Sequence, residues 1–205
     1  MTTTDRAEGS APPLDWDARF RADDAPWERQ GLHPAFAHWQ ALGQLTPGAR
    51  IYVPGCGRGE EPLALARAGL DVTAIDLSPT AIAWQRARFA EAGLPAHLGA
   101  GDAFAFLPET PLDLYWEQTF LCAIPPRLRE TYETAAHAQL RPGGVLLALF
   151  MQKDELGGPP YGCALPAMRA LFPEDRWGWP EDEPTAFPHP GLSGKPELAV
   201  ALVRR

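Results

Sequence analysis

A short apolar stretch ending in closely spaced glycines, Ile51-Tyr52-Val53-Pro54-Gly55-Cys56-Gly57-Arg58-Gly59, constrains the fold more than any other part of the sequence. Its first residues are β-branched or aromatic and predict a strand, and a helical pattern begins directly after Gly59. A chain turns this sharply only where φ can be positive, which glycine tolerates without steric cost. Bare backbone also lets a ligand lie on the free N–H groups at the start of a helix. The stretch therefore predicts a nucleotide-binding turn.

Strand and helix signals alternate along the rest of the chain. Strands are predicted over residues 50–54, 71–76, 96–100, 112–116, 145–151 and 198–203. Helices are predicted between them, over residues 60–68, 79–92 and 125–140. Ser78 and Pro79 are well suited to the N-cap and the first position of the second of these helices. Such alternation predicts an α/β fold, in which a parallel sheet carries helices on both faces.

Composition and charge argue against a nucleic-acid-binding protein and against a membrane protein. The chain has 205 residues, a formal net charge of −8 and three widely spaced cysteines. An acidic chain is not attracted to nucleic acid or to anionic membranes, and no apolar run reaches the length of a membrane span. We expect a monomeric, cytoplasmic protein in which residues 1–13 are a disordered tail and residues 14–205 form a single domain.

Aromatic residues gather near the N-terminus, at Trp16, Phe20 and Trp27. Trp16 and Phe20 have the i, i+4 spacing that places side chains on one face of a helix. The spacing favours a helix that packs these rings on the core, and the alternative is a lid that covers a ligand. Residues 34–45 then predict a helix whose inward face includes Leu42.

Carboxylates follow three of the predicted strands. Asp76, Asp102 and Glu117 stand at or just after carboxyl ends of strands, where sheets of this kind bind ligands. Asp76 lies about twenty residues beyond Gly55, where a carboxylate accepts hydrogen bonds from ribose hydroxyls. Asp102 either contacts the amino edge of an adenine, with Phe104 on the ring, or closes a turn. Glu117 either faces the charged part of the ligand or is a solvated carboxylate at a strand end.

The glycine spacing separates two classes of cofactor. NAD-type loops read G-x-G-x-x-G, whereas the third glycine here comes one residue earlier, in Gly55, Gly57 and Gly59. The pattern Val-Pro-Gly-Cys-Gly-Arg-Gly resembles the cofactor loop of class I S-adenosylmethionine-dependent methyltransferases. Pro54 is a departure, because many of those enzymes carry an acidic residue just before the glycines.

Five sequence blocks together resemble a narrower family. They are the aromatic run from Trp16 to Trp27, VPGCGRG, IDLSPTAI, TFLCAIPPRLRETY and GGPPY. Jointly they are similar to the thiopurine S-methyltransferase family, which includes thiol and halide methyltransferases, and the resemblance spans residues 14–172. It implies a Rossmann-like fold with a mostly parallel seven-stranded sheet, helices on both faces and an antiparallel C-terminal strand. It also implies an N-terminal aromatic lid over residues 14–46.

The resemblance assigns roles to individual residues. S-adenosylmethionine is expected on Trp16, Trp27, Gly55, Gly57, Gly59, Asp76, Leu77, Asp102, Ala103, Phe104, Glu117 and Gln118. The methyl acceptor is expected beside Phe20, Arg129 and Tyr161. A solvated helix arginine and a packed loop tyrosine are the alternative readings of the last two. The scattered histidines and cysteines predict no metal site.

The predicted chemistry is methyl transfer to a small soft nucleophile, such as a thiol, a thiopurine-like compound, a halide or a metalloid anion. A free thiol has a pKa near 8.5, so it needs only a modest local influence to ionise. A non-catalytic S-adenosylmethionine-binding protein is one alternative. A nicotinamide-dependent oxidoreductase is another, although the glycine spacing and the lack of a Tyr-x-x-x-Lys constellation speak against it.

Overall fold

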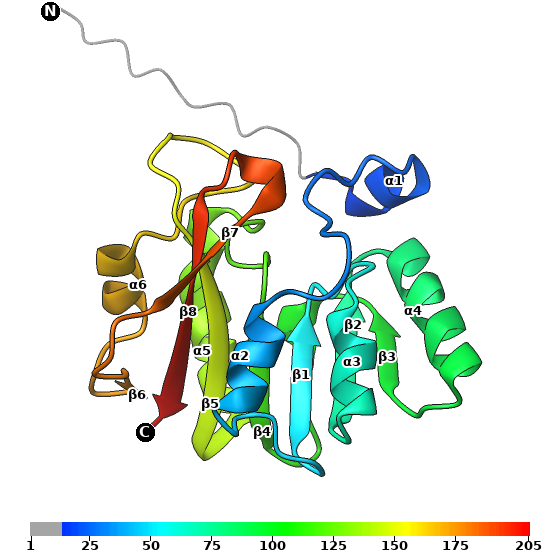
Figure 1. Cartoon of the computed structure of the whole chain (residues 1–205), viewed down its shortest axis with the longest axis horizontal. Helices are drawn as coiled ribbons and strands as arrows, with labels where there is room; N and C mark the ends of the chain where they lie inside the picture. The colour runs from blue at the N-terminus through cyan, green and yellow to red at the C-terminus, as the bar shows by residue number, and fades with distance from the viewer. Residues whose placement is uncertain (1–13) are drawn as a thin grey trace, which may run out of the picture.

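A computed structural model describes residues 14–205, and the predicted tail over residues 1–13 lies outside them. The strands form one eight-stranded sheet in the order β3-β2-β1-β4-β5-β8-β6, and β7 pairs with β8 beside that path. The first five strands of the order run parallel, whereas β8 runs antiparallel to β5. Figure 1 shows the arrangement.

The elements follow the alternation that the sequence predicts. In chain order they are α1 (Trp16–Arg21), α2 (Ala35–Ala41), β1 (Arg50–Pro54), α3 (Glu61–Arg67), β2 (Asp71–Asp76), α4 (Pro79–Ala92), β3 (His97–Ala100), β4 (Leu112–Glu117), α5 (Arg129–Gln139), β5 (Leu140–Met151), α6 (Leu165–Leu171), β6 (Trp177–Gly178), β7 (Thr185–Pro188) and β8 (Pro196–Arg204). Short 3₁₀ turns lie at Ala103–Ala105, Pro126–Leu128 and Pro190–Leu192.

Helices cover both faces of the sheet, as predicted. One buried cluster joins the strands to α2, α3 and α4, with Trp39 and Trp116 in contact at a centroid distance of 4.8 Å. The other joins the opposite face to α5 and α6 through side chains that include Tyr132 and Phe172. In Figure 1, α2 and α3 lie in front of the strands and α5 lies behind them.

The local signals before α4 act as predicted. Ser78 Oγ accepts a hydrogen bond from Ala81 N, and Pro79 begins the helix. Gly93 ends it with φ of +64°, a left-handed conformation that suits glycine. The helix therefore starts directly beyond the end of β2. Asp76, the last residue of β2, lies at the carboxyl ends of the parallel strands.

Several details differ from the sequence prediction, among them β5, which begins at Leu140 rather than at residue 145. The sheet has eight strands rather than seven, because the proline-rich C-terminal region adds the short strands β6 and β7 along β8. Leu42 is 60% exposed instead of buried, because α2 ends at Ala41, before Leu42 can turn inward. The helix predicted from residue 125 starts as α5 only at Arg129, because a 3₁₀ turn occupies the preceding proline-containing residues.

Candidate functional site

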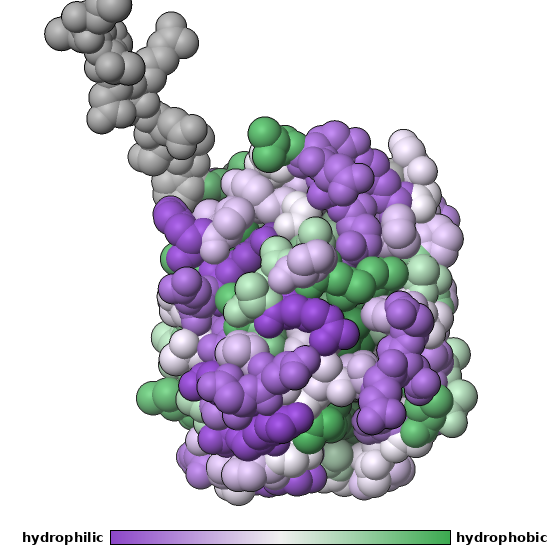
Figure 2. Space-filling view, turned by 90° about the vertical axis from the view of Figure 1, so that its left-hand side faces the viewer, coloured by the Kyte–Doolittle hydropathy of each residue, from purple (hydrophilic) through white to green (hydrophobic). Residues whose placement is uncertain are grey.

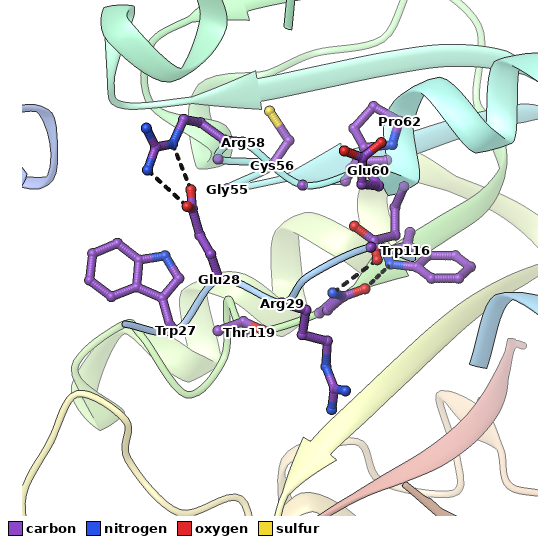
Figure 3. Close-up of a pocket in the computed structure, with 16 residues that line it drawn as sticks. Trp27, Glu28, Arg29, Gly55, Cys56, Arg58, Glu60, Pro62, Trp116 and Thr119 are labelled. Atoms are coloured by element: carbon purple, nitrogen blue, oxygen red, sulfur yellow. Dashed lines mark hydrogen bonds and ion pairs between the residues drawn. The ribbon is translucent and has the colours of Figure 1, made fainter. Parts of the chain in front are cut away.

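The candidate site is a cleft where the winding of the sheet reverses. β1 pairs with β2 on one side and with β4 on the other, so the carboxyl ends of β1 and β4 lie side by side. Ligands of open α/β sheets bind at such points. The cleft encloses about 70 Å³ between the glycine loop (residues 55–59), the start of α3, the end of β4 and the N-terminal segment (residues 14–33). Figure 3 shows its lining, with Trp27, Glu28 and Arg58 on one side and Trp116 on the other.

The first two glycines of the loop cannot be replaced without strain, because of their backbone conformation and their close neighbours. Gly55 and Gly57 have φ of +57° and +49°, in the left-handed region that other residues rarely adopt. A Cβ on Gly55 would collide with the Phe120 ring, and one on Gly57 would lie 3.2 Å from Phe20 Cζ. Bare backbone therefore allows two aromatic rings, from different parts of the chain, to lie directly on the loop.

Gly55→Ala tests this close approach. We expect the free energy of unfolding to fall by more than the roughly 1–2 kcal/mol that a left-handed conformation costs, because the Phe120 ring must also move. Gly93→Ala is the matched control, since Gly93 has a similar φ and no atom within 4 Å of the added Cβ. Thermal melts measure both variants, and equal losses of stability would show that Phe120 does not constrain the loop.

Asp76 lies at the end of β2, as predicted, and is 7% exposed. Its Oδ2 accepts a hydrogen bond from Gly57 N and its Oδ1 accepts one from Ser78 N, both at 2.8 Å. Burial raises the pKa of Asp76, although these hydrogen bonds oppose the shift. A carboxylate oxygen has further lone pairs. Asp76 therefore anchors the glycine loop to the strand, and its ribose-binding role stays a prediction.

The predicted adenine segment follows β3. Ala103 is buried, and its carbonyl accepts a hydrogen bond from the Tyr52 hydroxyl at 3.0 Å. Asp102 is exposed, and its Oδ1 closes the turn by accepting from Phe104 N at 2.9 Å. Its Oδ2 makes no hydrogen bond within residues 14–205 and stays accessible to a ligand. Leu77 is 59% exposed beside this segment. The turn-closing reading of Asp102 is thus confirmed, and the adenine-binding one stays a prediction.

Glu117 and Gln118 point in different directions at the end of β4. Glu117 is fully buried, and its Oε1 accepts hydrogen bonds from Phe120 N and Leu121 N at 3.1 and 2.8 Å. Burial raises the pKa of Glu117 to about 7, so it is not the solvated carboxylate of the alternative reading. It shapes the turn that carries Phe120. Gln118 lines the cleft and accepts a hydrogen bond from Trp116 Nε1 at 2.9 Å.

The three N-terminal aromatic rings form one group at the glycine loop. Trp27 lies edge-on to Trp16 and Phe20, at centroid distances of 5.3 and 5.8 Å. Phe20 is 5% exposed and lies over Gly57, and Trp27 lines the cleft. Trp16 supports Trp27 from behind rather than lining the cleft. The rings therefore pack together at the glycine loop, with Phe20 buried, and the lid stays a prediction.

Charged contacts that the sequence reasoning missed hold this segment in place. Arg58 of the glycine loop donates to both carboxylate oxygens of Glu28 at 2.8 Å and to Asp23 at 2.7 Å. Asp17 accepts hydrogen bonds from Ser78 Oγ at 2.6 Å and Thr80 N at 3.0 Å, at the start of α4. The hydrogen bond from Ser78 is the main cause that lowers the pKa of Asp17 to about 2. These contacts tie the N-terminal segment to the glycine loop and to the start of α4, and Arg29 and His33 tie it to Glu197 of β8 as well.

Arg129 and Tyr161 do not line the cleft that lies beside the glycine loop. Arg129 is 9% exposed, which excludes the solvated reading, and its guanidinium donates to Leu121 O at 3.1 and 3.2 Å and to Cys163 Sγ at 3.3 Å. Tyr161 is half-buried, and its N–H donates to Cys122 O at 2.7 Å. Both residues hold the segment after β4 against the Gly-Gly-Pro-Pro-Tyr loop, and their contact with an acceptor stays a prediction.

Two kinds of feature are not found in residues 14–205. No group of histidine, cysteine, aspartate or glutamate side chains there has an arrangement that could hold a metal ion. In the same part of the chain, no helix has the length and apolar character needed to cross a membrane. The three cysteines are free thiols and buried.

Comparisons with known proteins identify the family of this chain. The chain matches the family model described as thiopurine S-methyltransferase over residues 12–178. It is 33% identical to the probable thiol methyltransferase 2 of Arabidopsis thaliana, over 71% of this chain and 66%, just under two thirds, of that relative. It is also 33% identical to the thiopurine S-methyltransferase of Pseudomonas entomophila, over 83% of this chain and 85% of that relative.

Solved structures share the fold. The 1,6-didemethyltoxoflavin-N1-methyltransferase of Burkholderia thailandensis, solved with S-adenosylhomocysteine, has a TM-score of 0.72 at 20% identity, covering 91% of this chain and 84% of that one. The magnesium protoporphyrin IX methyltransferase of Synechocystis PCC 6803 has a TM-score of 0.69 at 14% identity, covering 92% and 95%. Likeness at such identities shows the fold, and the family match goes further. The chain belongs to the thiopurine S-methyltransferase family of S-adenosylmethionine-dependent methyltransferases.

Proposed function

We propose that the protein transfers a methyl group from S-adenosylmethionine to a small soft nucleophile. The observation that carries the proposal is the bare glycine loop at the sheet's switch point, anchored by the buried carboxylate of Asp76. The donor set fits this cofactor: Asp76 can accept from ribose hydroxyls, Phe104 and Trp27 offer aromatic faces, and the loop offers backbone contacts. These residues would hold the cofactor.

The chain's own contribution to the reaction is orientation and exclusion of water. When bound, S-adenosylmethionine supplies a methyl group on a positively charged sulfur that is open to in-line attack. Phe20 and Trp27 cover the glycine loop, which keeps water from the reacting atoms and aligns them. No histidine of residues 14–205 lines the cleft. A soft acceptor would need no strong base from the chain, since a thiol with a pKa near 8.5 ionises readily by itself.

The N-terminal segment is proposed as a lid that opens and closes. The cleft encloses about 70 Å³, whereas small-molecule sites usually enclose roughly 300–1,000 Å³. The segment is therefore proposed to move when the cofactor enters, which separates Arg58 from Glu28 and Asp23. The resemblance predicts residues 14–46 as the extent of this lid, but α2 within them is packed in the buried core through Trp39, so the part proposed to move precedes α2.

Arg58→Ala should loosen the lid. We expect S-adenosylhomocysteine to dissociate several-fold faster, because the ion pairs that hold the lid shut are lost. Stopped-flow tryptophan fluorescence, which Trp27 makes sensitive to the lid, measures the rate. Arg88→Ala is the matched control, since Arg88 pairs with Glu60 and not with the lid. Equal dissociation rates in Arg58→Ala and Arg88→Ala would argue against the ion-pair closure.

A screen of methyl acceptors tests the proposed function. The protein is incubated with methyl-labelled S-adenosylmethionine and a small thiol, a thiopurine, thiocyanate, iodide and a metalloid oxyanion. Relatives named as thiol, thiopurine and thiocyanate methyltransferases motivate this choice. We expect labelled product from at least one of them. Binding of the cofactor product without transfer to any acceptor would favour the non-catalytic binding protein.

The remaining proposals concern partners and location. A formal net charge of −8 supports a protein that binds neither nucleic acid nor anionic membranes. A monomer stays the proposed state, and on the face in Figure 2 hydrophilic and hydrophobic residues are interspersed rather than gathered in a broad apolar patch. Buried free thiols support a cytoplasmic location.

A further inference from the structure

The end of β1 lacks a negative charge that the proposed function calls for. S-adenosylmethionine carries a positively charged α-amino group on its amino-acid end. The residue before the glycines, Pro54, cannot pair with it, although many class I methyltransferases have an acidic residue there. If the protein binds this cofactor, the ammonium group needs another acceptor near the glycine loop, and a carboxylate would also balance its charge.

Glu61 is a carboxylate in that place. It is the first residue of α3 and lines the cleft, yet it is only 4% exposed. Its Oε1 accepts hydrogen bonds from His33 N at 3.0 Å and from Gln118 Nε2 at 3.2 Å. Its Oε2 lies against the loop, 2.8 Å from where a Cβ on Gly59 would stand. Glu61 therefore sits between the glycine loop and the end of β4.

Glu61 also differs from its neighbours in its charge balance. Glu28 and Glu60, which line the same cleft, pair with Arg58 and Arg88. Within residues 14–205, Glu61 has no cationic partner, and Oε2 accepts no hydrogen bond. The Glu61 side chain is largely buried, so a carboxylate charge there without a cationic partner costs free energy unless a cation binds it. The start of a helix offsets part of that cost, because its partial positive charge favours an anion.

We infer that Glu61 receives the α-ammonium group of the cofactor's amino-acid end, in place of the acidic residue that Pro54 replaces. The hydrogen bonds from His33 N and Gln118 hold the carboxylate in position through Oε1 and leave Oε2 for the ligand. Gly59 is required for this geometry, because any side chain there would meet Oε2. Glu61 is thus a cofactor-binding residue in this inference. The inference itself rests on the proposed function.

Binding calorimetry with two ligands tests the inference. One ligand is S-adenosylhomocysteine and the other is its analogue without the α-amino group. We expect wild type to prefer the first by about tenfold or more, the range for one charged hydrogen bond. In Glu61→Gln, which keeps an acceptor oxygen, this preference should fall to about twofold or less. Glu91→Gln removes an exposed charge of α4 outside the cleft and should keep the wild-type preference.

The outcomes separate the inference from the proposed function. If neither ligand binds wild type, the proposed function is wrong. If both bind wild type equally well, or if Glu61→Gln keeps the preference, the inference alone is wrong. If Glu61→Gln lowers the affinity for both ligands by the same factor, Glu61 only supports the conformation of the loop, and the inference is overturned.

Discussion

Asp76→Ala is expected to weaken the binding of S-adenosylhomocysteine by at least tenfold. The substitution removes a buried carboxylate that the proposal places on the ribose hydroxyls, and a hydrogen bond to a charged group contributes roughly 1.5–3 kcal/mol. It also frees Gly57 N and Ser78 N, which Asp76 now holds at 2.8 Å. We therefore expect a lower affinity for the ligand and a change in the conformation of the glycine loop. Isothermal calorimetry gives the affinity.

Asp71→Ala is the matched control for Asp76→Ala, because Asp71 is an exposed aspartate at the opposite end of β2. We expect its affinity to stay within about twofold of wild type. Asp76→Asn adds a second comparison, since the amide keeps an acceptor oxygen for the loop but loses the charge. An unchanged affinity in Asp76→Ala would remove this residue from the site.

The pH dependence of stability should carry the signature of Glu117. Burial raises its pKa from 4.5 to about 7 in the folded protein, so the folded state holds the proton more tightly than the unfolded chain does. The free energy of unfolding should therefore fall as the pH rises from about 4.5 to about 7, and level off above that range. The expected contribution is about 3 kcal/mol, since each pKa unit corresponds to about 1.36 kcal/mol.

Urea unfolding of wild type and Glu117→Gln across this pH range isolates the effect. Because Gln does not ionise, the difference between the two free energies of unfolding should change by about 3 kcal/mol between pH 4.5 and pH 8. Glu91→Gln, at an exposed position of α4, controls for the general effect of losing a carboxylate. A difference that stays constant with pH would mean that Glu117 ionises in the folded protein as freely as in the unfolded chain.

The parts of the site that the sequence predicted well are those fixed by local chemistry. A β-branched strand, a glycine turn and a capped helix are specified by neighbouring residues. For this reason the glycine loop and the start of α4 stand where expected. Asp76 follows from the same logic, because a residue at the end of a parallel strand must lie at the sheet's ligand-binding edge.

The parts that sequence reasoning missed depend on pairs far apart in the chain. Arg58 and Glu28 meet only once the N-terminal segment has folded over the glycine loop, so neither residue signals the other in sequence. The burial of Glu117 was missed because a carboxylate at a strand end is equally compatible with solvent, a ligand or the backbone of the next turn. In the structure Glu117 accepts hydrogen bonds from the backbone N–H groups of Phe120 and Leu121, so the turn after β4 is its environment.

Short elements account for the differences in the fold. β6 and β7 are held by pairing with β8, and their own residues carry too little alternation to predict a strand. Leu42 was misplaced because a helical pattern predicts which face a residue occupies but not where the helix ends, and α2 ends one residue before it.

Calorimetric titration of the wild-type protein with S-adenosylhomocysteine tests the central claim most directly. The claim is that the glycine loop, with the cleft beside it and Asp76 at the end of β2, holds this cofactor. We predict saturable binding of one ligand per chain, lost in large part in Asp76→Ala. The absence of any binding heat at millimolar ligand, in protein shown to be folded, would contradict the claim.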